Sequence, residues 1–106
     1  MFPRRHRLTR ERDIRHVLRG GRVRRGQFFS IRYSSYPGTT PRFTVVVSTR
    51  VSKSAVVRNT LKRQMREIIK KHLREFPPEN NYLVSIFPHT PLPTWKDLHE
   101  DLKKLL

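Results

Sequence analysis

The sequence predicts a single α+β domain, spanning residues 1–106, in which helices pack against a small β-sheet. A chain of 106 residues is close to the commonest size of one domain with one hydrophobic core. Apolar residues alternate with polar ones in some segments, as in a strand, and recur at helical spacing in others. No repeat, low-complexity block or long linker separates these segments. The expected order is therefore helix, two or three strands, helix, strand and helix.

The first element is expected to be a short helix over residues 10–19. Residues 1–7 before it are basic and lack periodicity, so we expect a flexible arm that becomes ordered on an anion. Thr9 is a candidate N-cap, and a Gly-Gly pair at 20–21 ends the helical pattern. The apolar side chains at helical spacing are Ile14, Val17 and Leu18.

Residues 21–48 carry the features of strands and turns. Residues 21–26 are basic and can hold one short edge strand, whereas residues 27–35 alternate apolar with polar side chains, which predicts a strand with one apolar face. Turn-forming residues at 37–41 precede a β-branched run at 43–48, which we expect to be a central strand. The two longer strands are expected to pair as a hairpin.

The longest helix is expected over residues 54–76, because apolar residues recur there with a period of 3.6 and a pair of prolines follows. Residues 82–87 should form another strand. Thr94 and Asp97 resemble a capping box that opens a last helix. The side chains expected to face inward from these two helices are Val57, Leu61, Met65, Ile68, Ile69, Leu73, Phe76, Trp95, Leu98, Leu102 and Leu105.

The charge of the chain points to a polyanionic partner. Twenty-four Lys and Arg against eight Asp and Glu give a net charge of +16, and such a field attracts nucleic acid. There are no cysteines, which excludes disulfides and thiolate metal sites. No apolar run approaches the roughly 20 residues of a membrane span, and the first residues are charged rather than signal-like, so we expect a cytoplasmic protein without a membrane partner.

The strongest local signal is a basic row on the long helix. Arg58, Lys62, Arg66 and Lys70 follow one another at four-residue steps, and Asn59 and Arg63 form a parallel row. An ordinary solvated face is the usual interpretation of such a row. Glu67 is the only acidic residue of the segment before Glu75, so the cations largely lack acidic partners at i+4 and repel one another, and an external polyanion is the better interpretation.

The start of the same helix carries further cations. Arg50, Lys53 and Arg58 surround a helix N-terminus, where free backbone N–H groups favour phosphate. Ser54 can act simply as an N-cap there, but that role does not explain the crowded cations.

Nothing in the sequence resembles a protein active site. No two of the five histidines (His6, His16, His72, His89 and His99) stand at i, i+3 or i+4, and we expect them to be surface or packing residues. The eight carboxylates are scattered, unlike the cluster that a two-metal nuclease needs. The sheet aromatics Phe29, Tyr33, Phe43, Tyr82 and Phe87 should be mostly core, with one or two exposed for stacking on bases.

Residues 55–67, AVVRNTLKRQMRE, resemble the signature segment of the bacterial ribonuclease P protein, whose usual form is A-V-x-R-N-R-x-K-R-x-x-R-E. Similarity to the family extends over residues 8–21, 82–87 and 95–106. The signature positions that match are Arg58, Asn59, Lys62, Arg63, Arg66 and Glu67.

The resemblance implies an αβββαβα order with a left-handed βαβ crossover, although crossovers are generally right-handed. It implies the non-catalytic protein subunit of an endoribonuclease that matures the 5′ end of tRNA. Its partners would be the catalytic RNA subunit, docked on the long helix, and precursor tRNA, whose single-stranded 5′ leader would lie in a cleft between the first helix and the sheet. The cofactor would be Mg²⁺, held chiefly by RNA phosphates.

The resemblance also assigns site residues. The RNA-subunit-binding set is Arg58, Asn59, Lys62, Arg63, Arg66 and Lys70, and the set that binds the leader or its phosphates is Ile14, Leu18, Arg32, Arg50 and Lys53. Three features depart from the family pattern. Thr60 replaces an arginine, Thr49-Arg50 replaces two lysines, and Ile14 and Leu18 replace phenylalanines, so apolar contact takes the place of stacking in the cleft.

Two alternatives stay open at this point. A ribosomal or general RNA-chaperone protein of similar fold would have the same composition, and selective binding to one RNA would distinguish the two. A self-sufficient cationic ribonuclease would need two histidines brought together by folding, and substitution of His16, His72 or His89 would then abolish activity of the protein alone.

Overall fold

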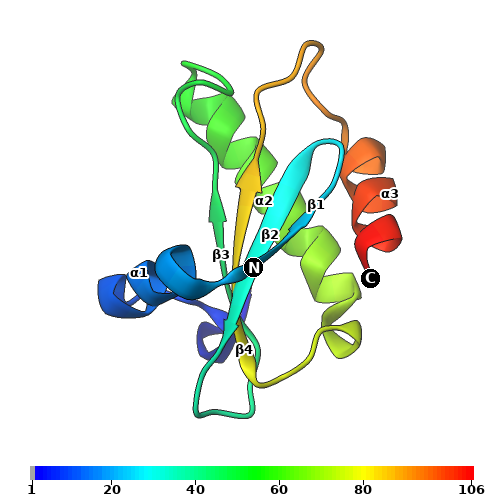
Figure 1. Cartoon of the computed structure of the whole chain (residues 1–106). Helices are drawn as coiled ribbons and strands as arrows, with labels where there is room; N and C mark the ends of the chain where they lie inside the picture. The colour runs from blue at the N-terminus through cyan, green and yellow to red at the C-terminus, as the bar shows by residue number, and fades with distance from the viewer. Residues whose placement is uncertain (1) are drawn as a thin grey trace.

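The computed structural model describes residues 2–106 and contains the expected order of elements (Figure 1). The long helix ends earlier than the predicted residue 76, and a short 3-10 turn follows it. The helices are α1 (Glu11–Gly20), α2 (Ala55–Lys71) and α3 (Trp95–Leu105), the strands are β1 (Arg22–Arg25), β2 (Phe29–Ser35), β3 (Arg42–Val46) and β4 (Asn80–Ile86), and the 3-10 turns are η1 (Arg4–His6) and η2 (Leu73–Glu75).

The four strands form one mixed sheet in the order β1-β2-β4-β3. The predicted hairpin between β2 and β3 is wrong, because β4 lies between them: Tyr82 of β4 pairs with Tyr33 of β2 on one side and with Phe43 of β3 on the other. The segment expected to be central, β3, is therefore an edge strand. The two interior strands are β2 and β4. In β4 the consecutive residues Leu83 and Val84, which point to opposite faces of the sheet, are both buried.

Strands β3 and β4 are parallel neighbours, and α2 connects them as a βαβ crossover. In the view of Figure 1, β3 and β4 both point upward, β4 lies to the right of β3, and α2 passes behind the sheet. This crossover is left-handed, as the resemblance implied and against the general rule. As a consequence, α2 shares one face of the sheet with α3, and α1 lies on the other.

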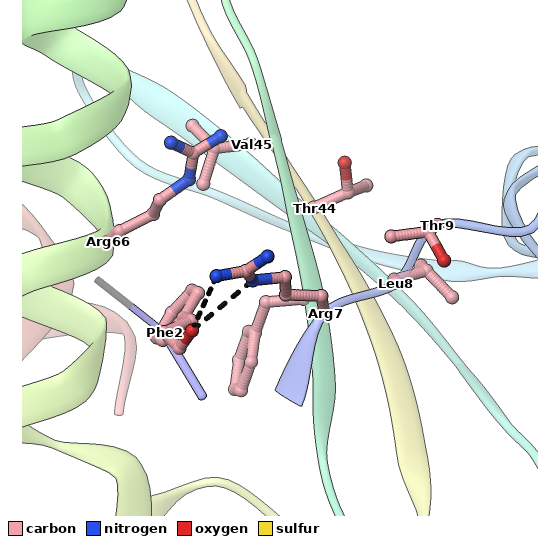
Figure 2. A pocket seen from close by; sticks show the side chains of 8 residues that line it. Phe2, Arg7, Leu8, Thr9, Thr44, Val45 and Arg66 are labelled. Carbon is pink, nitrogen blue, oxygen red and sulfur yellow. Dashed lines mark hydrogen bonds between the residues drawn. The ribbon is translucent and has the colours of Figure 1, made fainter. Parts of the chain in front are cut away.

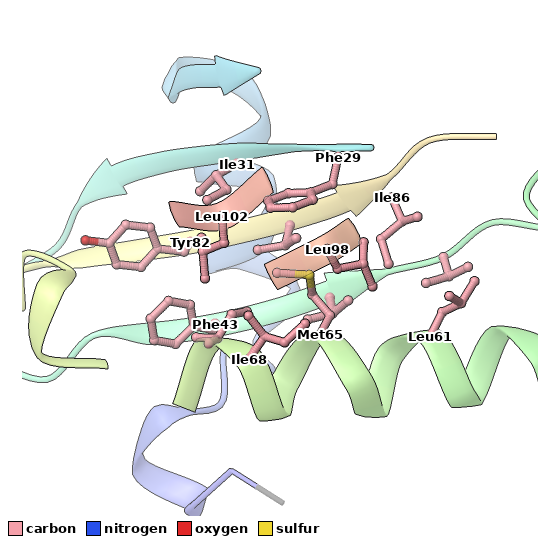
Figure 3. Close-up of a cluster of buried hydrophobic side chains, with 14 of the residues drawn as sticks. Phe29, Ile31, Phe43, Leu61, Met65, Ile68, Tyr82, Ile86, Leu98 and Leu102 are labelled. Atoms are coloured by element: carbon pink, nitrogen blue, oxygen red, sulfur yellow. The ribbon is translucent and has the colours of Figure 1, made fainter. Parts of the chain in front are cut away.

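The main core lies between the sheet and helices α2 and α3 (Figure 3). Phe43 stacks on Tyr82 with ring centroids 4.8 Å apart, and Phe76 meets both rings edge-on. The predicted apolar side of the long helix is confirmed, because its buried residues are Leu61, Met65, Ile68 and Ile69. Leu98 and Leu102 of α3 are fully buried against them, as predicted.

A smaller cluster lies on the opposite face of the sheet, under α1. Val17 is fully buried against Leu8 and Leu83, and Ile14 packs at its margin. Leu18, the third residue of the predicted stripe, remains 50% exposed. Helix α1 therefore covers the sheet by a narrow contact and leaves part of that face open. Thr9 is not its N-cap, because the capping position is Arg10, which makes no side-chain capping bond.

The N-terminal segment is docked rather than free, which corrects the expectation of a flexible arm over residues 2–7; Met1 lies outside the described residues. Phe2 is buried and stacks on Phe43 with ring centroids 5.5 Å apart. His6 is buried, with its Nδ1 2.8 Å from the carbonyl oxygen of Pro41. The backbone N–H of Leu8 donates to the carbonyl of Phe43. Apolar burial and these bonds hold the segment along the edge of β3.

Helix α3 is fixed at its start and again in its second half. The predicted capping box is present, since Thr94 and Asp97 each bond the other's backbone N–H. Asp101 is buried and its two carboxylate oxygens accept the backbone N–H groups of Gln27 and Phe28 at 2.9 and 2.8 Å. A Cβ at Gly26 would lie 2.5 Å from this carboxylate, so only glycine fits the turn there.

No helix within residues 2–106 combines the length and the apolar character needed to cross a membrane.

Candidate nucleic-acid interface

The outward side of α2 carries the predicted basic row. Arg58 is partly buried and donates from Nη1 to the carbonyl of Ser52 at 2.9 Å, so its guanidinium is fixed at the start of the helix. Thr60, which stands where the family has arginine, bonds back to the carbonyl of Val56. The remaining side chains line one shallow groove along the helix; they are Asn59, Lys62, Arg63, Arg66, Glu67 and Lys70.

The cations of this groove have no partner among residues 2–106. The ion pairs in this part of the chain involve Arg15, Arg42 and His72, and none involves a lysine or arginine of α2. Like charges at helical neighbours cost a few tenths of a kcal/mol per pair. An external anion relieves this repulsion, so the geometry favours phosphate binding along α2. The predicted row of cations is thus present as one continuous surface.

Ser54 is an N-cap, which confirms the simpler of its two interpretations. Its hydroxyl accepts the backbone N–H of Val57 at 3.3 Å, so the protein itself satisfies one free N–H at the helix start. Arg50 and Lys53 are exposed in the loop that leads from β3 into α2. Both cations remain available to an anion. Of the free backbone N–H groups at the helix start that they were expected to surround, that of Val57 is already bonded to Ser54.

The structure brings only some of the predicted leader-binding residues together. Ile14 packs on Leu83, and Arg32 pairs with Leu83 across the sheet, so Ile14 and Arg32 share the face that α1 covers. Leu18 is exposed on α1 itself. Arg50 and Lys53 belong to the loop after β3, which lies at the top of that strand in Figure 1 and away from α1. A leader would have to span the open sheet face to contact both groups.

The sheet aromatics are mostly core, as predicted. Phe29, Phe43 and Tyr82 are buried, whereas Tyr33 and Phe87 are partly exposed. The guanidinium of Arg25 lies 4.7 Å from the centre of the Phe87 ring, a cation–π contact that leaves an amphipathic surface at the end of β4. Phe87 is the aromatic residue best placed to contact a base on the open face, because side-chain alternation puts it on the same side as Leu83.

One feature that the sequence did not reveal is a pair of histidines brought together by folding. Nε2 of His72, just after α2, lies 2.8 Å from Nε2 of His99 on α3, and Glu75 bonds Nδ1 of His72. Partial burial, together with the nearby positive charges of Lys103, His72 and Lys71, lowers the pKa of His99. The sequence signal was weak: His72 precedes Leu73 and His99 follows Leu98, two leucines that pack on the main core.

This pair does not have the arrangement of a nuclease. Its two Nε2 atoms bond each other, so neither is directed at a substrate phosphate. Within residues 2–106, no three His, Asp or Glu side chains lie close enough together to hold a metal ion.

A basic α+β domain with a continuous row of unpaired cations on one helix defines a class of RNA-binding protein. The family model for ribonuclease P matches residues 2–106, so the chain belongs to the ribonuclease P protein family. A ribonuclease P protein component from a Pseudanabaena species is 35% identical over 107 residues, covering 100% of this chain and 92% of the relative. One from Thermus scotoductus is 39% identical over 90 residues, covering 84% of this chain but 51% of the longer relative.

Solved structures show the same fold. The ribonuclease P protein of Thermotoga maritima superimposes with a TM-score of 0.84 at 23% identity, covering 94% of this chain and 96% of the other. That of Staphylococcus aureus gives 0.83 at 20% identity, covering 94% and 91%. The chain is therefore the protein subunit of the ribonucleoprotein ribonuclease P, an endoribonuclease complex of tRNA 5′ maturation, and its partner is the ribonuclease P RNA.

Proposed function

We propose that the outward face of α2 is the surface that binds the ribonuclease P RNA. The observation that carries this proposal is the row of Arg58, Lys62, Arg66 and Lys70, whose charges have no acidic partner within residues 2–106. Arg58 is held in place by the carbonyl of Ser52, which lowers the entropy lost when it meets a phosphate. Asn59 and Arg63 supply further donors on the same groove.

The open face beside α1 is the proposed site of the 5′ leader of precursor tRNA. Ile14 and the half-exposed Leu18 offer apolar contact, and Arg32 offers a cation on the same face. Arg50 and Lys53, in the loop after β3, would meet phosphates further along the strand. Binding of the leader would raise affinity for precursor over mature tRNA, because only the precursor carries this segment.

Catalysis is proposed to reside in the RNA subunit, with Mg²⁺ held chiefly by RNA phosphates. The donors of this chain do not fit a resident Mg²⁺, since no cluster of three potential ligands occurs within residues 2–106. The protein would contribute by positioning the substrate and by screening phosphate repulsion with its net charge of +16.

The salt dependence of binding tests the role of α2. Binding to about 6–10 phosphates releases their counterions, so raising the salt concentration from 50 to 200 mM lowers the affinity by roughly 10³–10⁵. We expect a steep plot of log K against log salt for the cognate ribonuclease P RNA. Lys62→Ala with Arg66→Ala should reduce the slope by about one for each phosphate that the protein no longer neutralises. Lys96→Ala, an exposed cation on α3, is the matched control and should leave the slope unchanged.

A flat salt plot, or an equal change of slope in the Lys96 control, would contradict this assignment. Equal affinity for ribosomal RNA of similar length would favour the general RNA-chaperone alternative instead.

A further inference from the structure

A pocket of about 230 Å³ lies at the open edge of β3, between the N-terminal segment and α2 (Figure 2). Arg7 lines it from the N-terminal segment and Arg66 from α2. Thr9 and Thr44 stand at its rim on the side of α1, and Phe43 and Val45 contribute apolar surface. The pocket therefore lies between the outward face of α2 and the sheet face beside α1.

The two arginines have free charge directed into this space. Nε and Nη2 of Arg7 donate to the carbonyl of Phe2 at 3.2 and 3.1 Å, which fixes the guanidinium and leaves Nη1 available. Figure 2 shows the guanidinium of Arg66 extending from the opposite side, toward Val45. No carboxylate lines the pocket, and neither arginine forms an ion pair within residues 2–106. Two guanidinium groups facing one small space repel each other unless an anion lies between them.

The backbone of β3 adds further polar groups. The carbonyl of Phe43 accepts the N–H of Leu8, so this residue turns its polar groups toward the outer edge of the sheet. In a parallel ladder, the backbone N–H and carbonyl groups of every second residue point toward the same side of the strand. Val45, two residues on, therefore directs its N–H and carbonyl to the same open edge, where the pocket lies. These groups, with the hydroxyls of Thr9 and Thr44, can bond a sugar or a phosphate.

We propose that this pocket binds one phosphodiester of an RNA strand between Arg7 and Arg66, with the adjoining ribose against Thr9 and Thr44. RNA is the favoured ligand because Arg66 also lines the basic groove of α2, so a strand bound there reaches the pocket without a break. The strand then passes around the edge of β3 onto the face beside α1. The docked N-terminal segment is thus part of the RNA interface. This inference rests on the proposed role of α2.

A comparison of salt slopes tests whether Arg7 and Arg66 share one phosphate. The slope counts neutralised phosphates. Because the shared phosphate is held between both arginines, Arg7→Gln alone and Arg7→Gln with Arg66→Ala should each reduce the slope by about one. Arg66→Ala with Lys70→Ala, whose side chains would meet separate phosphates, should reduce it by about two. Arg4→Ala is a matched control, because Arg4 is exposed in the same segment but does not line the pocket. A reduction by two for Arg7 with Arg66, or none from Arg7, would overturn the proposal.

A tethered cleavage reagent tests the same point with both arginines intact. The chain has no cysteine, so a single Thr9→Cys variant can carry iron–EDTA at the rim of the pocket. We expect cuts in the RNA within a few nucleotides of the bound phosphate, whereas the same reagent on Lys96→Cys of α3 should give none there. Asn59→Cys, on the α2 groove, reports on the proposed function separately.

The probe is applied to the complex with ribonuclease P RNA alone and with precursor tRNA added, with each RNA end-labelled in turn. Cuts in the ribonuclease P RNA assign the phosphodiester to that RNA, and cuts in the precursor assign it to the substrate. If Asn59→Cys cuts and Thr9→Cys does not, this inference fails while the proposed function stands. If neither cuts, both fail. Thermal unfolding of Arg7→Gln, followed by circular dichroism, checks that the N-terminal segment remains docked.

Discussion

The Nε2 atoms of His72 and His99 lie 2.8 Å apart and thereby connect the end of α2 to α3. A hydrogen bond between two imidazole nitrogens requires that one of them lack a proton. Glu75 bonds the other ring nitrogen of His72. The contact between the two Nε2 atoms therefore needs one unprotonated nitrogen and depends on pH.

We expect the free energy of unfolding to fall as the pH is lowered below about 6.5, which is the ordinary pKa of a histidine side chain. The pKa of His99 is lowered by partial burial and by Lys103, His72 and Lys71, with Glu100 acting weakly in the opposite direction. The unfolded chain therefore binds a proton at a higher pH than the folded one, and stability is lost between the two pKa values. Urea unfolding across pH 5–8 measures the effect.

His99→Gln should flatten this pH dependence, because it removes the group whose pKa differs between the two states. His16→Gln, an exposed histidine on α1, is the control and should retain it. An unchanged pH profile in His99→Gln would show that another group is responsible.

Asp101→Ala should destabilise the fold by about 2–4 kcal/mol, because it leaves the backbone N–H groups of Gln27 and Phe28 without their acceptor. Asp101→Asn keeps one acceptor oxygen and should cost less. Glu100→Ala, exposed on the same helix, should change stability by less than about 0.5 kcal/mol. Urea unfolding provides the comparison, and equal losses for Asp101→Ala and Glu100→Ala would contradict the role given to Asp101.

Leu18→Phe should increase the preference for precursor over mature tRNA. Leu18 is 50% exposed beside the open sheet face, so a larger ring fits without disturbing the core and can stack on a leader base. Stacking on an aromatic ring contributes roughly 1–3 kcal/mol per base. Binding assays of the complex with both tRNAs measure the ratio, and Leu92→Phe, in the exposed loop before α3, should not alter it.

A photoreactive leader nucleotide should crosslink to residues 10–19 and to the sheet face next to α1. Crosslinks confined to the helix residues 58–71 would instead place the leader on α2 and refute the assignment of the two faces.

The purified protein should cleave no RNA by itself, and adding it to the ribonuclease P RNA should lower the Mg²⁺ needed for precursor cleavage. The net charge of +16 screens phosphate repulsion that divalent ions must otherwise neutralise. A precursor-tRNA cleavage assay with protein, RNA and both, across a Mg²⁺ series, measures this. Cleavage by RNA-free protein that His72→Gln or His99→Gln abolishes would support the self-sufficient ribonuclease instead.

The sequence by itself determined the local structure and the main basic surface. Helix α2 and strand β2 follow from periods of 3.6 and two, and the Thr94–Asp97 capping box from residues three apart, because these patterns depend on neighbours along one element. The row from Arg58 to Lys70 was visible for the same reason. The left-handed crossover came from resemblance to a family and not from any pattern of residues.

Only the tertiary structure decided which distant segments meet. The position of β4 between β2 and β3 depends on burying Leu83 and Val84 on both sheet faces at once, and no local pattern encodes which neighbours do so. Phe2 belongs to a basic segment but is buried in the core, because the ring of Phe43 on the edge strand β3 is available for it to stack on. The contact of His72 with His99 and the approach of Arg7 to Arg66 arise from the same long-range packing, which joins side chains that the sequence keeps far apart.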